Sequence, residues 1–366
     1  MFDLIVVGGG PAGLATAIHG TKRGLSVVVL DRRDLPLDKA CGEGLMPRGV
    51  AALSEMDVEV PAWGRAPFFG IRYIRTDEVA EARFRGGRGL GVRRTALIEG
   101  LVSRARRLGA DLRYGCAVEG WKREGDRRVV VRTSGGVLRG VLLIGADGLH
   151  SRIRAQAGLA KPSSGPLRYG VRRHFRIRPW SDLVEVHWSD GAEAYVTPVG
   201  PESVGVAVLW GGDGSRFPQL LERFPGLRER LAGIPTTSEA LGAGPLRQEV
   251  TRRYADGVAL VGDAAGFLDP LTGEGVALAF DCAGALVETV ARAGSLAAYE
   301  RAYRRLTRRY YWGTRLLLAV ALRPMLRRRL VATLARRPGL FEHFLHLLTG
   351  PPRPGIEEVS GPASLA

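Results

Sequence analysis

Three glycines near the start of the chain, Gly8, Gly10 and Gly13, restrict its fold more than any other feature does. They follow a strand-like run, Asp3–Val7, and precede a helix-like stretch. A second strand-like run, LSVVVLD, then ends at Asp31. A strand, a glycine turn, a helix and a second strand ending in an acidic residue form the βαβ unit that is typical of dinucleotide binding.

The glycine motif has a physical role in holding a dinucleotide. The glycines permit a tight turn and let the pyrophosphate approach the backbone, while the N-terminus of the following helix faces the phosphates with free amides. Asp31 is placed to accept hydrogen bonds from the ribose hydroxyls of an adenosine. We therefore assign cofactor binding to Gly8, Gly10, Pro11, Ala12, Gly13, Asp31 and Arg32. The motif alone does not distinguish FAD from NAD.

Two later motifs distinguish these cofactors. GADGLHSRIR begins at Gly145, and VGDAAGFLDPLTGEG begins at Val261. In this order and spacing the three motifs resemble the group A flavoprotein family, which includes the p-hydroxybenzoate-hydroxylase-like monooxygenases and the geranylgeranyl reductases. The resemblance covers roughly residues 1–300. It implies an α/β protein whose Rossmann-type FAD-binding domain is interrupted by an antiparallel-sheet substrate domain.

The resemblance also implies roles for charged residues near the cofactor. Asp263, in the pair with Gly262, would accept hydrogen bonds from the ribityl hydroxyls of the flavin. Asp147 would support the cofactor loop near the phosphates, and Arg94 resembles an arginine found beside the FAD. Two alternatives stay open: Asp263 could be only a helix cap, and Arg94 only a solvated charge.

The end of the third motif is assigned to the flavin ring. By the resemblance, Gly273, Glu274 and Gly275 would bring backbone amides to the pyrimidine edge of the isoalloxazine, and Pro270 belongs to the same loop. A helix that begins there directs its positive end at this edge, which stabilises the anion of reduced flavin.

The stretch KACGEGL, together with PLTGEG, is closest to the geranylgeranyl-reductase-like branch of the family. Many aromatic hydroxylases carry a histidine where this chain has Gly266. In the reductase branch the KACGEGL loop lies across the flavin and bounds the substrate cavity. Cys41 is therefore a candidate catalytic residue, the alternative being a packed small side chain. Glu43 is a candidate proton donor or an ion-pair partner of an arginine.

The predicted substrate domain contains AEAYVTPVG. Tyr195 and Pro198 occupy the place of a tyrosine, tryptophan and proline motif of archaeal geranylgeranyl reductases, although the tryptophan is absent here. We assign both residues to the substrate pocket. His174 and His187 lie on strand-like segments, and we expect them to be packed or surface histidines rather than bases.

The chain divides into three parts and a tail. We predict a discontinuous FAD-binding domain from residues 1–64, 91–160 and 250–295, and a substrate domain from residues 65–90 and 165–249. Turn residues between short strand-like runs indicate the antiparallel sheet of the second domain. Residues 296–350 are predicted to form a basic helical region, and residues 351–366 a flexible tail.

These features predict an FAD-dependent oxidoreductase. The leading hypothesis is a monooxygenase that uses NAD(P)H as a transient reductant and oxidises an aromatic or polyketide-like small molecule through a flavin C4a-hydroperoxide. The alternative is a geranylgeranyl-reductase-like enzyme that saturates carbon–carbon double bonds of an isoprenoid or lipid substrate. A third hypothesis, a membrane or nucleic-acid binder with a structural FAD, rests only on the positive charge of the chain.

That charge is concentrated near the C-terminus. The formal net charge is +16, and residues 301–337 contain twelve arginines and no Asp or Glu. Basic helices interrupted by leucine-rich patches suit peripheral contact with an anionic membrane surface. A nucleic-acid partner is not expected, because no recognition motif accompanies the charge.

The remaining composition points to a cytoplasmic enzyme, with contact at the inner face of the membrane as an open alternative. We expect no secretory leader, because the first strand-like run begins at once. Cys41, Cys116 and Cys282 lack the spacing of a zinc site, so no metal is expected. The longest apolar run, LLLAVAL, is shorter than a bilayer-spanning segment. The sequence leaves the oligomeric state open.

Overall fold

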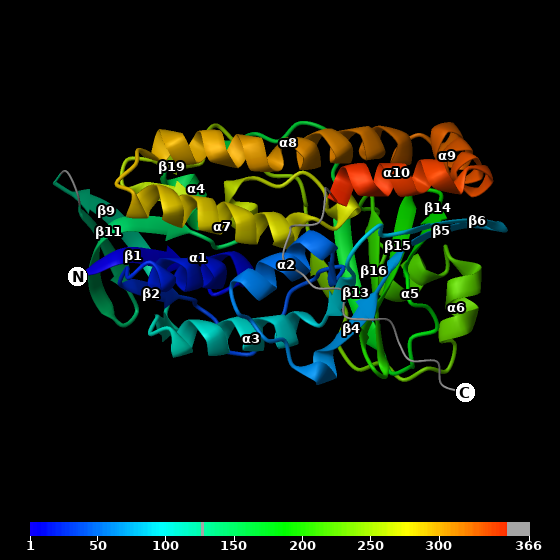
Figure 1. Cartoon of the computed structure of the whole chain (residues 1–366), viewed down its shortest axis with the longest axis horizontal. Coiled ribbons are helices and arrows are strands. Elements are labelled where there is room, and N and C mark those ends of the chain that lie inside the picture. Colours follow the sequence, from blue (N-terminus) through cyan, green and yellow to red (C-terminus); the bar gives the residue numbers. More distant parts are fainter. Residues whose placement is uncertain (126–127, 350–366) are drawn as a thin grey trace.

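The computed structural model of the chain describes residues 1–125 and 128–349. Two sheet-based halves lie side by side along the long axis of the molecule, and the long helix α8 (Leu296–Ala321) runs along both (Figure 1). The fold is the mixed α/β architecture that the sequence predicts. The predicted tail at residues 351–366 lies outside the described residues.

The first half is built on a sheet whose centre is parallel. β1 (Phe2–Val7) pairs with β2 (Val27–Leu30) on one side and with β11 (Gly136–Gly145) on the other. All four residues of β2 are buried, because a parallel strand covered on both faces is a continuous apolar run. The other strands of this sheet are β8 (Asp111–Arg113), β9 (Val118–Glu124), β10 (Arg128–Thr133), β19 (Tyr254–Ala255) and β20 (Val258–Leu260).

Helices of the first half pack around α1 (Pro11–Lys22). This helix follows the glycine turn directly, with proline at its first position, where the missing N–H costs nothing. It packs against α3 (Arg94–Arg107) and α7 (Gly275–Ala291), and α7 in turn packs against α8. The order strand, turn, helix, strand therefore places the glycine turn at the carboxyl edge of the sheet.

The second half is a seven-stranded sheet in the order β17, β13, β16, β15, β14, β5, β6. Neighbouring strands are antiparallel except β14 and β5, which are parallel. Strands from residues 65–90 join this sheet at one edge. The strands are β5 (Gly70–Arg75), β6 (Glu78–Arg83), β13 (Tyr169–Phe175), β14 (Val184–Ser189), β15 (Ala192–Gly200), β16 (Ser203–Trp210) and β17 (Leu241–Ala243).

The predicted C-terminal helices are confirmed. After α8 come α9 (Pro324–Arg336) and α10 (Pro338–Thr349), each beginning with a proline at its first position, and both pack against β6. Their apolar side chains form one core with the second sheet, in which the ring of Phe341 lies 4.6 Å from the ring of Tyr73. Among the described residues, no helix is long and apolar enough to cross a membrane.

Short elements connect the two halves. A three-stranded sheet of β3 (Gly44–Leu45), β7 (Gly89–Val92) and β4 (Arg65–Phe68) lies where they meet, and β7 and β4 also contact β15. The remaining elements are α2 (Pro47–Glu55), η1 (Ala62–Gly64), α4 (Arg152–Gln156), β12 (Ala160–Lys161), α5 (Phe217–Leu221), α6 (Pro225–Leu231), β18 (Glu249–Val250), η2 (Gly262–Ala265) and η3 (Pro270–Thr272).

Candidate active site

A cavity of about 830 Å³ lies at the carboxyl ends of β1, β2 and β11. Open α/β sheets bind ligands at this edge. Residues from distant parts of the chain line it together. Among the predicted cofactor residues these are Gly8, Gly10, Pro11, Ala12, Asp31, Arg32, Arg94, Asp147 and Asp263.

The glycine turn is shaped for a pyrophosphate. Gly8 has a φ of +113°, and a Cβ there would overlap the carbonyl oxygen of Ala146. A Cβ at Gly13 would overlap the carbonyl oxygen of Gly8, so helix and strand pack closely. Beside Gly10 there is open space, and no side chain caps the first turn of α1. Free amides next to open space fit an anionic group.

Asp31 faces this turn. Its carboxylate accepts hydrogen bonds from the backbone N–H of Gly9, at 2.8 Å, and from that of Arg33, at 2.9 Å. These bonds fix the carboxylate at the wall of the cavity, where the sequence predicts contact with the ribose.

Asp263 presents a half-buried carboxylate to the same cavity. Its Oδ2 lies 2.9 Å from Lys39 Nζ. Burial alone would raise the pKa of Asp263, but Lys39, Arg94 and Arg154 more than offset burial and lower it. Arg154 also donates hydrogen bonds to the carbonyl oxygens of Asp263 and Ala264, which fixes η2. Lys39 was not predicted as a partner of Asp263, because 224 residues separate the two in the sequence.

Asp147 uses its carboxylate within the protein. It accepts hydrogen bonds from the Ser151 hydroxyl at 2.5 Å and from the backbone N–H groups of Arg152 and Ile153 at 2.7 and 3.1 Å. The carboxylate therefore caps α4 beside the cavity. This contact is compatible with the predicted supporting role in the cofactor loop, which stays a prediction.

A second cavity adjoins the first, since Lys39, Arg94 and Asp263 line both. Its volume is about 190 Å³ and its walls are mostly apolar. Cys41 and Tyr195 line this cavity, with Leu317 of α8 and three apolar residues of α10. Burial raises the pKa of Tyr195 well above its usual value, so its phenol is neutral. The α10 residues are Phe341, Phe344 and Leu345.

Pro198 is not brought to this cavity. Side chains on a strand alternate between the two faces, so Tyr195 and Thr197 of β15 line the cavity together. Pro198 follows on the opposite face, and its carbonyl oxygen lies against Gly91 of β7. Pro198 therefore contacts a neighbouring strand here, and its assignment to the substrate pocket stays a prediction.

The loop before α7 lies at the junction of the two cavities. Pro270, Gly273 and Gly275 line the second cavity, whereas the carboxyl of Glu274 is buried beneath the loop. Burial raises the pKa of Glu274 to about 8, although Arg48 opposes the shift. Gly262 adopts a φ of +61° at the start of η2. This arrangement leaves backbone of the loop, rather than the Glu274 side chain, exposed to the junction.

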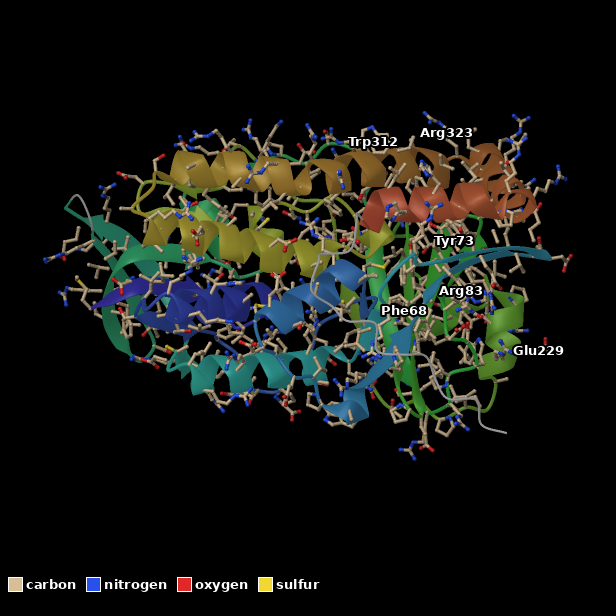
Figure 2. The ribbon with its side chains drawn as sticks, viewed as in Figure 1. Phe68, Tyr73, Arg83, Glu229, Trp312 and Arg323 are labelled. Atoms are coloured by element: carbon tan, nitrogen blue, oxygen red, sulfur yellow. The ribbon has the colours of Figure 1, made fainter. Side chains whose placement is uncertain are left out.

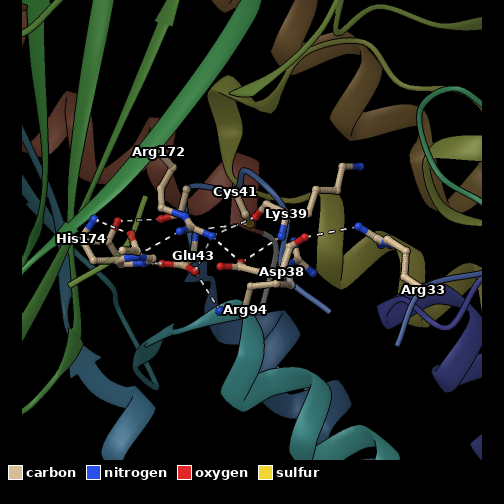
Figure 3. Close-up of polar contacts among 11 residues, drawn as sticks. Arg33, Asp38, Lys39, Cys41, Glu43, Arg94, Arg172 and His174 are labelled. Carbon is tan, nitrogen blue, oxygen red and sulfur yellow. Dashed lines mark hydrogen bonds and ion pairs between the residues drawn. The ribbon is translucent and has the colours of Figure 1, made fainter. Parts of the chain in front are cut away.

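A buried polar network surrounds Cys41 (Figure 3). Cys41 Sγ accepts a hydrogen bond from the backbone N–H of Glu43 at 3.3 Å. One carboxylate oxygen of Glu43 lies 2.6 Å from His174 Nε2, and the other accepts the backbone N–H of Arg94 at 2.8 Å. Arg172 lies 3.7 Å from the same carboxylate. His174 was expected to be a packed or surface histidine, and it is buried; its carboxylate partner was not predicted.

Comparison with known proteins agrees with this arrangement. The family model described as "FAD binding domain" matches residues 1–203, which is more than half of the chain. The chain belongs to the FAD-binding-domain family. The glycine turn, the acidic residues and the cavity of this flavoprotein fit an FAD, and its relatives show that it is an FAD-dependent oxidoreductase.

Sequence relatives of the flavoprotein include reductases. Digeranylgeranylglycerophospholipid reductase 1 of Methanopyrus kandleri is 31% identical over 300 residues, which cover 77% of this chain and 78% of the relative. Menaquinone reductase of Mycolicibacterium smegmatis is 28% identical over 332 residues, covering 84% and 81%. The predicted resemblance to geranylgeranyl-reductase-like flavoproteins is confirmed.

The fold is shared with a solved monooxygenase-like structure. A probable FAD-dependent monooxygenase from Pseudomonas aeruginosa, pqsL, superposes with a TM-score of 0.69 at 20% identity, covering 83% of this chain and 91% of that one. At this identity the likeness concerns the fold alone. The predicted Rossmann-type flavoprotein fold is therefore confirmed. The likeness does not distinguish a monooxygenase from a double-bond reductase.

Proposed function

We propose that this flavoprotein is a reductase that saturates a carbon–carbon double bond of an isoprenoid or similar lipid-like substrate. The observation that carries the proposal is the apolar second cavity, which places Cys41 next to the cofactor cavity. Reductases among the sequence relatives support it, since the name of one includes a phospholipid with two geranylgeranyl groups.

The walls of the second cavity suit an aliphatic chain. Aromatic and aliphatic side chains of β5, β14, α8 and α10 surround it, and the polar side chains of its sheet wall are those of Tyr73, Arg172, Tyr195 and Thr197. Its volume of about 190 Å³ is smaller than the roughly 300–1,000 Å³ of sites that enclose a whole ligand. Only the reacting end of a long substrate therefore needs to lie inside.

The proposed reduction needs two electrons and two protons. When bound and reduced by NAD(P)H, FAD would supply a hydride equivalent to one carbon of the double bond. The other carbon takes a proton from an acid of the protein, and Cys41 is the thiol that lines the cavity.

Replacement of Cys41 by serine tests this assignment. A general acid typically contributes at least about 100-fold to the rate, and a serine hydroxyl is a far weaker acid. We expect Cys41→Ser to keep stoichiometric FAD and to lose about 100-fold in substrate-dependent turnover, measured by mass spectrometry as product two hydrogens heavier. Cys282→Ala, on α7, is the control and should retain turnover. Full turnover in Cys41→Ser would refute the role of the thiol.

Monooxygenation is the second candidate function. The fold shared with a probable monooxygenase favours it, as does a mostly apolar cavity beside the cofactor cavity. The same assay separates the two reactions. A product one oxygen atom heavier, formed with consumption of dissolved oxygen, would replace the reductase proposal.

Peripheral contact with an anionic membrane would suit a lipid-like substrate. On α8, Leu317 lines the cavity while Trp312, 61% exposed, lies on the outer side (Figure 2). Further exposed apolar residues follow at the start of α9, where Met325 is 64% exposed. Exposed arginines, among them Arg323, surround these side chains. Apolar and cationic groups side by side fit the headgroup region of an anionic bilayer.

Vesicle sedimentation tests this contact. We expect the protein to bind phosphatidylcholine vesicles that contain about one third phosphatidylglycerol, and Trp312→Ser to weaken this binding about tenfold, because burial of an indole is lost. Trp63→Ser is a matched control, since Trp63 is 52% exposed outside the C-terminal helices. Equal binding by both variants, or equal binding to vesicles of pure phosphatidylcholine, would contradict the proposal.

A further inference from the structure

We propose that Arg172 and His174, on β13 of the second sheet, are positioning residues that hold Cys41 in a reactive state. The inference rests on the proposed function only in that Cys41 is taken to lie at the reacting end of the cavity. It adds two residues from the other half of the molecule, which reach Cys41 through the carboxylate of Glu43.

The strand β13 holds residues 38–43, the Cys41 loop, at both ends. At the beginning of the loop, Arg172 donates hydrogen bonds to Asp38 Oδ1, at 2.5 Å, and to the carbonyl oxygen of Lys39, at 3.2 Å. At its end, His174 contacts Glu43. Arg172 and His174 are almost fully buried, with side-chain exposures of 1% and 0%. Charge-assisted hydrogen bonds in such surroundings fix geometry strongly.

The tautomer of His174 follows from its neighbours. Arg172 Nη1 lies 3.0 Å from His174 Nδ1, and a guanidinium can only donate. Nδ1 must therefore be the acceptor, and the ring proton sits on Nε2, which donates to Glu43 at 2.6 Å. The Ser238 hydroxyl lies 2.8 Å from Nδ1 as a second neighbour. Arg172 thus directs the donor side of the imidazole at the carboxylate.

Space for this pair is provided by a glycine. Gly205 of β16 is the register partner of His174. A Cβ at Gly205 would lie 3.2 Å from Glu43 Oε2 and 3.4 Å from His174 Cδ2. The sheet therefore has a gap on this face that the carboxylate and the imidazole fill.

Glu43 connects the residues of β13 to the thiol of Cys41, because it contacts both. Its backbone has a φ of +58°, a left-handed conformation that is uncommon for residues other than glycine. Bonds to both carboxylate oxygens hold it there, and in this conformation its N–H is directed at Cys41 Sγ. Without the bond to His174, the side chain loses an anchor that supports the uncommon backbone conformation.

The second contact with the thiol comes from Arg94. Glu43 accepts the backbone N–H of Arg94 at the start of α3, so the loop and this helix are joined. Burial lowers the pKa of the Arg94 guanidinium, but its interactions with Cys41, Glu43 and Asp263 more than offset burial and raise it. The backbone N–H of Glu43 and the guanidinium of Arg94 therefore fix the position of the sulfur.

The contacts of His174 with Arg172 and Glu43 are kept at neutral pH. Burial lowers the pKa of His174, Arg172 and Arg93 lower it further, and Glu43 opposes them. The imidazole is therefore neutral above its usual pKa of about 6.5. Protonation of His174 in acid would put a proton on Nδ1. Two donors, this N–H and the Arg172 guanidinium, would then face each other. Since the folded pKa is depressed, the contribution of His174 to stability is present above the unfolded pKa and is lost as pH falls.

Alkylation of Cys41 by iodoacetamide in the oxidised holoenzyme tests the proposal, with the modified peptide quantified by mass spectrometry between pH 6 and pH 9. His174→Asn is polar but too short to reach Glu43, whereas His174→Gln places an amide N–H near the Nε2 position. We expect His174→Asn to slow alkylation at pH 7 about tenfold, because the loop that positions the sulfur loses one hydrogen bond to a charged group. His174→Gln should restore the rate to within about threefold of the wild type.

His187→Asn is the matched control. His187 lies on β14 and pairs with Glu185 at 3.2 Å, which makes it a second histidine–carboxylate pair in the same sheet, away from the loop. It should leave alkylation of Cys41 unchanged. FAD content and thermal midpoints verify that each variant is folded.

Three results would overturn the proposal. These are an unreactive Cys41 in the wild type, equal rates in His174→Asn and the wild type, and equal impairment of His174→Asn and His174→Gln. Because alkylation needs no substrate and no turnover, its result is independent of the reaction that the flavoprotein catalyses. A failure of the reductase proposal is therefore distinguishable from a failure of this one.

Discussion

Asp263→Ala is expected to weaken FAD binding by at least about 100-fold. Hydrogen bonds to a charged group contribute roughly 1.5–3 kcal/mol each, and the substitution removes an ionised acceptor from the cavity wall. It also leaves the ammonium of Lys39 without the carboxylate that lies 2.9 Å away. The measurement is the FAD retained per chain after gel filtration, followed by titration of the apoprotein with FAD fluorescence.

A surface aspartate provides the control for this prediction. Asp182 pairs with Arg83 in an exposed ion pair, and exposed pairs contribute at most about 1 kcal/mol. Asp182→Ala should keep its FAD. If Asp263→Ala also elutes with one FAD per chain, the assignment of Asp263 to the cofactor site is wrong.

Gly91→Ala is expected to lower the free energy of unfolding by about 3 kcal/mol, at the upper end of the range for overpacked positions. Gly91 lies on β7, and a Cβ there would overlap the carbonyl oxygen of Pro198 on β15. Backbone cannot move aside as the end of a flexible side chain can, so the two strands must separate. The measurement is urea unfolding of the holoenzyme, monitored by tryptophan fluorescence and by release of FAD.

Another strand glycine serves for comparison. The nearest atom to a Cβ at Gly120 of β9 is Arg132 Nη2 at 3.5 Å, an ordinary contact with a flexible side chain. Gly120→Ala should change stability by no more than about 0.5 kcal/mol. Equal urea midpoints for the two variants would show that β7 and β15 can separate without cost.

The cofactor half of the molecule was predictable because its signals are local. A glycine turn between a strand and a helix has few alternative structures, and an acidic residue at the end of the next strand completes the unit. The structure places Gly8, Gly10 and Asp31 around one cavity. Two further motifs, each a strand end followed by a turn, position Asp147 and Asp263 at the same edge.

The substrate side was less predictable because its contacts join distant segments. The partners Glu43 and His174 are separated by 131 residues, and neither carries a motif that points to the other. Phe341 and Leu345 repeat at helical spacing, a pattern that indicates an apolar helix face but not the cavity this face covers. Pro198 was assigned by its place in a motif, whereas strand alternation decides which face it occupies.

The anchorage of the Cys41 loop to β13 bears on how a substrate enters. Arg172 and His174 bind the two ends of a loop that belongs to the other half of the molecule, and both bonds are buried. Hinge-like separation of the halves would break them together and leave charges unpaired in an apolar interior, which is costly. The C-terminal helix α10 lies over the opposite wall, where its described apolar side chains, Phe341 among them, pack against Tyr73 and its neighbours. Displacement of α10 would therefore cost less free energy than separation of the two halves. It would open the second cavity beside the surface that carries Trp312.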